Sequence, residues 1–312
     1  MSSQRCTPAT PKSEPPAGEP PDPGPPLPAP IPPAPEASMP RQPRHGVLLD
    51  IDGPLVLGGR AMPGAADALR RLRDLEIPFV LLSNTTRVTG AQLVVELNEL
   101  GLDVSREAVV SVADIAVEHL HRLHPGARVM FLGQGTPLAG ARVRLVERDA
   151  DIVLSGGNGP QVTFEHVNAA LRELLAGARL IAMHRSLTWA RPDGPAIDIG
   201  PTVRGLEAAS GARAVVLGKP SPHAFQAAAD HIGVTLAGSV MVGDDLHNDV
   251  LAAQRLGMHG VLTLTGKTSP AQLAACGRRP DHVLDSVADL SGLLPRPGLP
   301  PRPSLPEHRS TR

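Results

Sequence analysis

Two carboxylates stand two residues apart in the motif Asp50–Gly53 (DIDG), at the end of the apolar run Gly46–Ile51. The chain turns just past a strand end, so one carboxylate can act as a nucleophile while the other transfers a proton. Gly53 permits a tight turn and a close approach of the backbone to a ligand. Taken alone, the motif fits a solvated acidic loop equally well.

Two further motifs offer groups that bind an anion. In Ser83–Thr86 (SNTT), a hydroxyl and successive backbone N–H groups at a strand-to-helix junction suit an anion, helped by the helix dipole, although an ordinary helix cap has the same composition. In Gly218–Pro222 (GKPSP), a proline-stiffened turn can hold the Lys219 ammonium against a phosphoryl group. Each motif is weak evidence by itself, because helix caps and surface lysines are common.

The fourth motif, Gly243–Asp249 (GDDLHND), contains three carboxylates. Carboxylate oxygens suit a hard cation such as Mg²⁺, which usually takes one or two of them together with water and substrate. Acidic side chains also cap helix N-termini, and capping explains Asp249 and Asp245 without a metal. Asp244 is therefore the strongest metal candidate of the three.

Short apolar runs alternate with helical patterns between these motifs. Runs that are apolar throughout are typical of a parallel sheet covered on both faces, so we predict an α/β fold with a Rossmann-like, doubly wound parallel sheet. Ligands of such sheets bind outside the carboxyl ends of the strands. Four polar side chains are expected to converge there: Asp50, Ser83, Lys219 and Asp244.

The region 104–213 separates the second motif from the third and has strand and helix patterns of its own. We predict that it is a smaller α/β cap domain inserted into a catalytic core made of 44–103 and 214–290. Of the 35 prolines, 15 fall in residues 1–40 and 6 in residues 295–312. Segments of this composition bury too little apolar surface to fold, so 1–43 and 291–312 are predicted to be disordered tails.

Composition excludes several classes of function. The 30 basic and 31 acidic residues give a net charge of -1, which provides no field to attract nucleic acid or an anionic membrane. Aromatic residues make up only 2% of the chain, too few for base-stacking surfaces. The chain has two cysteines and no uncharged apolar run of about 18 residues, so we expect a cytoplasmic protein without a membrane span.

In this order along the chain, the four motifs resemble the signature of the haloacid dehalogenase-like hydrolase superfamily, over about residues 44–290. The position of the insertion, between the serine and lysine motifs, resembles the C2 cap of subclass IIA, the NagD-like phosphatases. The stretches Ser83–Thr86, His184–Gly194 and Thr265–Lys267 are similar to the branch of haloacid dehalogenase-like hydrolase domain-containing protein 2 and phospholysine phosphohistidine inorganic pyrophosphate phosphatase.

This resemblance implies a Mg²⁺-dependent phosphatase acting on a small phosphorylated substrate, with Asp50 as the nucleophile that forms an aspartyl phosphate and Asp52 as general acid and base. It also implies that a homodimer can form through the cap. The resemblance further implies phosphate binding by Ser83, Asn84 (through its N–H) and Lys219. It implies Mg²⁺ binding by Asp50, the Asp52 carbonyl and Asp244. Asp245 or Asp249 is expected to support the Mg²⁺ ligands. In the cap, His184 and Trp189 either contact the leaving group or belong to a structural loop, two interpretations of equal weight.

One residue departs from the superfamily pattern. Pro54 follows Gly53 and has no N–H, so a phosphate donor is missing if that amide would face the ligand, and nothing is lost if it faces solvent, which we favour. Two other functions use the same fold: a phosphate-binding or partner-docking protein with weak or no activity, and a phosphotransferase. A binding protein need not keep both Asp50 and Asp52, and their presence favours an enzyme.

Overall fold

The computed structural model describes residues 45–157, 159, 162–191 and 194–294. The predicted tail 1–43 and most of the predicted tail 291–312 lie outside the described residues. The fold and the sites below concern the described part of the chain.

The first sheet has six strands in the order β15-β14-β13-β1-β4-β5, and every neighbouring pair is parallel. Its strands are β1 (Val47–Leu49), β4 (Phe79–Ser83), β5 (Val109–Ser111), β13 (Val240–Gly243), β14 (His259–Thr263) and β15 (His282–Leu284). From β1 the chain first adds strands on one side and later on the other. This is the predicted doubly wound parallel sheet.

Helices cover both faces of this sheet, which explains why its central strands are apolar throughout. One apolar cluster packs one face against α1 (Ala65–Asp74) and α2 (Gly90–Glu99), and another packs the opposite face against α6 (Pro222–Ile232) and α7 (Leu251–Gln254). The described helices also include α8 (Pro270–Ala275) and two 3₁₀-helices, Arg106–Ala108 and Val287–Gly292. Within the described ranges, no helix is long and apolar enough to cross a membrane.

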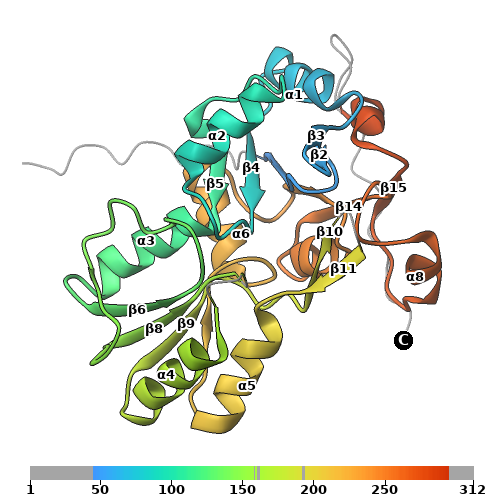
Figure 1. The fold of residues 1–312 in the computed structure, drawn as a ribbon. Helices are drawn as coiled ribbons and strands as arrows, with labels where there is room; N and C mark the ends of the chain where they lie inside the picture. Colours follow the sequence, from blue (N-terminus) through green and yellow to red (C-terminus); the bar gives the residue numbers. More distant parts are fainter. Residues whose placement is uncertain (1–44, 158, 160–161, 192–193, 295–312) are drawn as a thin grey trace, which may run out of the picture. The chain divides into compact units, whose positions relative to one another are not determined.

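The second sheet has five parallel strands in the order β12-β9-β8-β6-β7. They are β6 (Arg128–Leu132), β7 (Arg144–Leu145), β8 (Ile152–Ser155), β9 (Arg179–Ala182) and β12 (Val215–Val216). Figure 1 shows α4 (Phe164–Leu175) and α5 (Gly200–Ser210) on one face of this sheet and α3 (Val112–Leu123) on the other. The inserted region is therefore a separate parallel α/β layer, as predicted.

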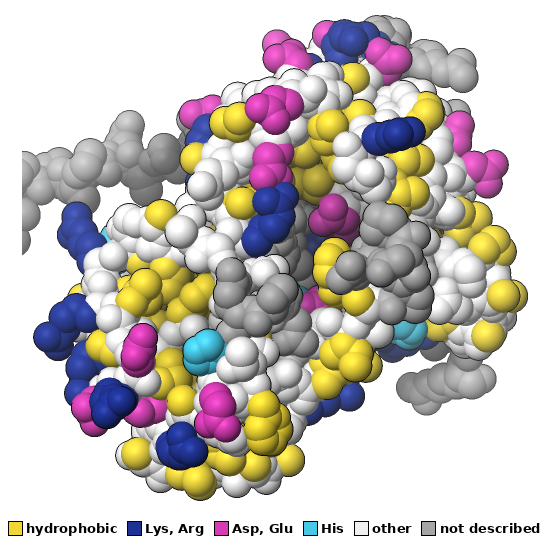
Figure 2. All heavy atoms as spheres, viewed as in Figure 1, with side chains coloured by type: hydrophobic (Ala, Val, Ile, Leu, Met, Phe, Trp, Pro, Cys, Tyr) yellow, Lys and Arg dark blue, Asp and Glu magenta, His cyan; other side chains and the backbone are white. Residues whose placement is uncertain are grey.

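Two antiparallel hairpins complete the described strands: β2 (Val56–Leu57) with β3 (Arg60–Ala61), and β10 (Thr188–Arg191) with β11 (Gly194–Ile197). On the face drawn in Figure 2, Lys and Arg side chains are interspersed with Asp and Glu, and hydrophobic side chains reach the surface between them. Trp189 and Ile197 of the β10–β11 hairpin are among the exposed hydrophobic residues.

Two short strands, β5 and β12, pair with a different sheet from the one that the predicted domain boundaries imply. β5 falls inside the predicted cap but pairs with β4 of the first sheet, and β12 falls inside the predicted core but pairs with β9 of the second. The sheet division therefore does not follow the expected boundaries at 104 and 214. An apolar run of two or three residues can pair with either sheet, so its composition does not reveal its partner. The division into a catalytic core and a cap remains a prediction.

One apolar cluster joins the two sheets. It contains Leu48 and Val80 from the first sheet and Ile152 and Ile181 from the second, together with Phe225 of α6. Phe225 is completely buried. The two sheets therefore share part of one hydrophobic core.

Replacing Phe225 should destabilise the whole described region. Phe225→Ala removes a buried ring from the shared cluster, so we expect it to lower the free energy of unfolding by about 3–5 kcal/mol. The matched control is Phe164→Ala, since Phe164 is 78% exposed and its loss should cost less than about 0.5 kcal/mol. Urea denaturation measures both variants, and equal losses would contradict a shared core centred on Phe225.

Candidate active site

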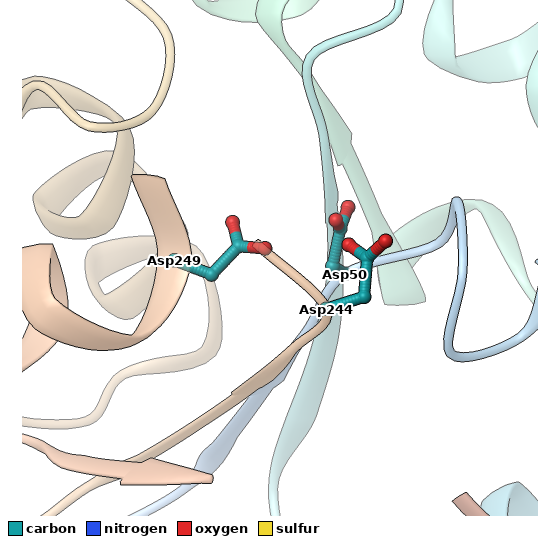
Figure 3. A group of neighbouring side chains, drawn as sticks. All are labelled: Asp50, Asp244 and Asp249. Atoms are coloured by element: carbon teal, nitrogen blue, oxygen red, sulfur yellow. The ribbon is translucent and has the colours of Figure 1, made fainter. Parts of the chain in front are cut away.

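Three carboxylates meet at the carboxyl edge of the first sheet. Asp50 follows β1, Asp244 follows β13, and Asp249 lies in the π-helix Leu246–Val250. The strands β1 and β13 are neighbours at the point where the strand order reverses, which is where such sheets form a ligand crevice. One oxygen from each carboxylate lies within 4.8 Å of the others. Figure 3 shows the Asp50 and Asp244 carboxylates side by side, with the Asp249 carboxylate directed toward them.

Lys219 places a buried ammonium among these carboxylates. Its Nζ lies 2.8 Å from Asp50 Oδ1 and 2.8 Å from Asp249 Oδ1, and the side chain is only 3% exposed. Burial acts to lower the pKa of Lys219, but the charges of Asp249 and Asp50 raise it above its ordinary value. Lys219 therefore stays protonated and partly offsets the buried negative charge.

The carboxylates outnumber this one cation. Burial raises the pKa of Asp50 to about 6, against the pull of Lys219. Burial and the charge of Asp249 raise the pKa of Asp244 to about 7, and burial raises that of Asp249 to about 8. Three buried carboxylates with one ammonium leave an excess of negative charge, and their oxygen donors fit a hard divalent cation such as Mg²⁺.

A loop after β14 holds the Asp244 carboxylate in place. Asp244 Oδ2 accepts a hydrogen bond of 2.6 Å from the backbone N–H of Lys267, and a Cβ added at Gly53 or Gly266 would overlap that carboxylate. Thr265 Oγ1 donates to the carbonyl of Gly53 at 2.9 Å. The loop Thr265–Thr268 therefore ties the DIDG motif to Asp244. In the sequence this loop showed only a family resemblance, and its role was missed.

Asp245 precedes the π-helix Leu246–Val250, Asp249 lies in its first turn, and only Asp249 belongs to the carboxylate cluster. Asp245 Oδ1 accepts the N–H groups of His247 and Asn248, each at 3.0 Å, so Asp245 caps the π-helix. Burial acts to raise the pKa of Asp245, but the Lys267 ammonium at 2.8 Å and the bonds from Asn248 bring it below its ordinary value. The capping explanation therefore holds for Asp245. Asp249 takes part in the same cap, since its Oδ2 accepts the N–H of Asp245 at 3.2 Å, and its carboxylate also joins the buried cluster.

Ser83 is the last residue of β4 and Asn84 follows it, and neither residue starts a helix. Ser83 is buried, and its Oγ accepts the N–H of Thr85 at 3.0 Å. Helix α2 begins only at Gly90, after the cap residue Thr89. The expected strand-to-helix junction at Ser83 is therefore wrong, and so are both the helix-dipole argument and the helix-cap alternative for this motif. The side chain of Asn84 instead bonds the backbone of Lys219.

Asp52 is exposed, unlike the three clustered carboxylates. Desolvation of the carboxyl by the surrounding protein raises the pKa of Asp52, although the charges of Lys219 and Arg87 act to lower it. Sequence reasoning missed Arg87, which forms two hydrogen bonds to Glu96 of α2, one of them 2.8 Å long. No local pattern signals this pair, because its partners lie nine residues apart and on either side of a helix start.

Pro54 is buried in the turn that follows Asp52. In this turn, the N–H groups of Leu55 and Val56 both donate to the carbonyl of Ile51, at 3.0 and 2.9 Å. The residue is therefore not at the surface, contrary to the favoured interpretation that this position faces solvent. Its missing N–H leaves the turn intact.

The two predicted cap residues lie outside the carboxylate cluster. His184 follows β9 and is buried, and its Nδ1 accepts the N–H of Ser186 at 3.3 Å. Burial lowers the pKa of His184, although Asp198 opposes the shift and the Lys267 charge adds to it. His184 is thus a neutral imidazole within electrostatic reach of the loop that holds Asp244. Trp189 is 46% exposed in the β10–β11 hairpin.

Two family models match the chain: "Haloacid dehalogenase-like hydrolase" over residues 47–143 and a HAD-hydrolase-like model over residues 216–290. The chain is 33% identical to human haloacid dehalogenase-like hydrolase domain-containing protein 2 over 249 residues, which cover 76% of this chain and 95% of that protein. It is 30% identical to human phospholysine phosphohistidine inorganic pyrophosphate phosphatase over 263 residues, covering 80% and 93%.

Solved structures show the same architecture. A p-nitrophenyl phosphatase from Archaeoglobus fulgidus superimposes with a TM-score of 0.75 at 27% identity, covering 81% of this chain and all of that one. NagD from E. coli K-12 superimposes with a TM-score of 0.70 at 29% identity, covering 80% and 98%. Both matches extend over the two sheets described above.

The excess of buried carboxylates predicts a stability that depends on pH and on Mg²⁺. The pKa values of Asp50, Asp244 and Asp249 are raised in the folded state. Their contribution to the free energy of unfolding is therefore full in acid and is lost as pH rises through about 6–8. Mg²⁺ would replace the lost protons, so millimolar Mg²⁺ should raise Tm more at about pH 8 than at about pH 5.5. Thermal unfolding measures this difference. A Mg²⁺ shift that is equal at both pH values, or that survives in Asp244→Asn, would contradict the assignment.

Crowding at Gly266 predicts a local effect on the same site. Gly266→Ala places a methyl group on the Asp244 carboxylate, so it should displace that carboxylate and reduce the Mg²⁺-dependent rise in Tm at least about threefold. Gly277→Ala is the matched control, because a Cβ there meets nothing within 4 Å. Identical Mg²⁺ shifts in the two variants would show that Asp244 does not depend on this loop.

Proposed function

Because the chain belongs to the haloacid dehalogenase-like hydrolase family, as a NagD-like phosphatase of subclass IIA, we propose that it hydrolyses a small phosphorylated substrate through an aspartyl phosphate on Asp50. The observation that carries this proposal is the position of the Asp50 carboxylate. It stands at the strand-order reversal, beside Asp244 and 2.8 Å from the Lys219 ammonium.

In the first step, an Asp50 oxygen attacks phosphorus, and the bond from phosphorus to the leaving oxygen breaks. Asp52 donates a proton to that oxygen, a role that the raised pKa of Asp52 supports. In the second step, water attacks the phosphorus of the aspartyl phosphate and gives its proton to Asp52. Inorganic phosphate leaves, and the Asp50 carboxylate is restored.

The phosphoryl oxygens would bind to the Ser83 hydroxyl, the Asn84 N–H and the Lys219 ammonium. Mg²⁺ would be held by Asp50, the carbonyl of Asp52 and Asp244, with Asp245 and Asp249 supporting these groups. Its charge would offset the repulsion between a phosphate dianion and the buried carboxylates. The raised pKa values of Asp50, Asp244 and Asp249 support a need for this added positive charge.

The names of similar proteins guide the choice of substrates. They include a phosphatase named for phospholysine, phosphohistidine and inorganic pyrophosphate, a dihydroxyacetone phosphatase and a p-nitrophenyl phosphatase. We infer a small phosphorylated compound, with His184 and Trp189 of the inserted region as contacts of its leaving group. A homodimer through the cap and a cytoplasmic location remain predictions.

The two alternatives from sequence use the same fold. A phosphotransferase would use the same residues and differ only in the acceptor, whereas a binding protein would not need both Asp50 and Asp52. The presence of both Asp50 and Asp52 supports an enzyme over a binding protein, and hydrolysis and phosphotransfer would share this site.

A phosphate-release assay tests the proposal. With Mg²⁺ and a panel that includes p-nitrophenyl phosphate and pyrophosphate, the wild type should be active, and Asp50→Asn should lose all measurable turnover because the nucleophile is gone. Asp52→Asn should lose about 10²- to 10⁴-fold in kcat. Asp74→Asn is the matched control, since Asp74 is an exposed residue at the end of α1. A wild type no more active than Asp50→Asn on every compound would refute the proposal.

A further inference from the structure

We propose that Asn84 is a positioning residue whose side-chain amide fixes the backbone of Lys219, and through it the ammonium that pairs with Asp50 and Asp249. This role is separate from that of the Asn84 backbone N–H, which the proposed function gives to the phosphate. The inference rests on the proposed function, because it concerns the cation of the same site.

The contact consists of two complementary hydrogen bonds. Asn84 Nδ2 donates to the carbonyl oxygen of Lys219 at 2.9 Å, and Asn84 Oδ1 accepts the N–H of Lys219 at 2.9 Å. The amide thus occupies both backbone polar groups of Lys219, as a neighbouring strand would. Two bonds in one ring fix the orientation of the Lys219 backbone as well as its position.

The Asn84 amide bonds the first residue beyond the end of sheet pairing, Lys219. Beyond β12, the N–H of Gly218 still donates to the carbonyl of Met183 at 2.7 Å, next to the end of β9. Lys219 is the next residue, and its backbone bonds go to Asn84 instead. A Cβ at Gly218 would lie 2.5 Å from both Asn84 Oδ1 and the Met183 carbonyl, so this segment is tightly enclosed.

Such a link is needed because Lys219 comes from the other sheet. Asp50 follows a strand of the first sheet, whereas Lys219 follows β12 at the edge of the second. Asn84 follows β4, which pairs directly with β1. The amide therefore places the lysine backbone relative to the strand that carries Asp50. A displacement of about 1 Å at a reacting centre can cost about 100-fold in rate.

A second asparagine side chain, that of Asn98, bonds a backbone in the same way. Neither Asn98 nor its partner Val104 belongs to the carboxylate cluster. Asn98 of α2 donates from Nδ2 to the carbonyl of Val104 at 2.9 Å and accepts the N–H of Val104 at 2.7 Å. The hydrogen bonds of both amides are partly buried, although Asn98 itself is exposed and Asn84 has intermediate burial. Their replacement by leucine, which has a similar volume, removes the same two bonds at two different places.

The experiment compares Asn84→Leu with Asn98→Leu in the full chain, using p-nitrophenyl phosphate and Mg²⁺. Both variants should lose a few degrees of Tm, because each loses two hydrogen bonds. Only Asn84→Leu should lose kcat, by about 10- to 100-fold, although it keeps the backbone N–H at position 84. Asn98→Leu should stay within about twofold of the wild type. Equal kcat losses in the two variants would overturn the proposal.

A second background separates positioning from a general effect on the site. In Lys219→Arg the cation is already displaced, so adding Asn84→Leu should change kcat by less than about threefold. A full additional loss would show that Asn84 acts independently of Lys219 and would overturn the proposal. If Asn84→Leu does not fold, Asn84→Asp replaces it, because it keeps the shape and the bond from the Lys219 N–H. A kcat lowered about fivefold or more then supports the proposal, and an unchanged kcat overturns it.

Failure of this inference can be told apart from failure of the proposed function. A wild type that is inactive on every compound removes the proposed function, and this inference with it. An active wild type with Asn84→Leu as active as Asn98→Leu removes only the positioning role.

Discussion

The buried ammonium of Lys219 is the interaction on which the site depends. It lies 2.8 Å from each of two buried carboxylates that would otherwise repel each other. A buried charge is tolerated only when its partners are close and well oriented. The surrounding groups therefore serve to hold positions: the Asn84 amide on the Lys219 backbone, the close packing at Gly218, and the Thr265–Thr268 loop on Asp244.

The partners of this interaction come from both sheets. Asp50 and Asp244 follow the two strands at the reversal of the first sheet, and Lys219 follows the edge strand of the second. The shared apolar cluster around Phe225 packs residues of both sheets together, and polar bonds near the site add a finer alignment. Hydrophobic burial thus brings the sheets together, while directional bonds set the distances between charged atoms.

Much of the fold was predictable, because apolar runs and helical spacing report local structure. The strand before Asp50 and the doubly wound parallel sheet lie where the patterns predicted them, and the family resemblance is confirmed. The sheet membership of β5 and β12 was not predictable, since such short runs fit either sheet. The bonds of Asn84 to Lys219 and of Lys267 to Asp244 span 135 and 23 residues, so they depend on the tertiary path and leave no local pattern.

Each predicted domain contributes one strand to the sheet of the other, β5 to the first sheet and β12 to the second. The two predicted domains therefore cannot be separated at the boundaries 104 and 214 without breaking both sheets. Removing residues 104–213 would take β5 out of the first sheet and leave β12 without its partner β9. The same cut would remove Met183, whose carbonyl holds Gly218 beside the lysine. A chimera that exchanges the inserted sheet between relatives therefore has to join the chains after Ser111 and beyond Gly218, and the donor sheet then brings with it β12, the strand that precedes Lys219.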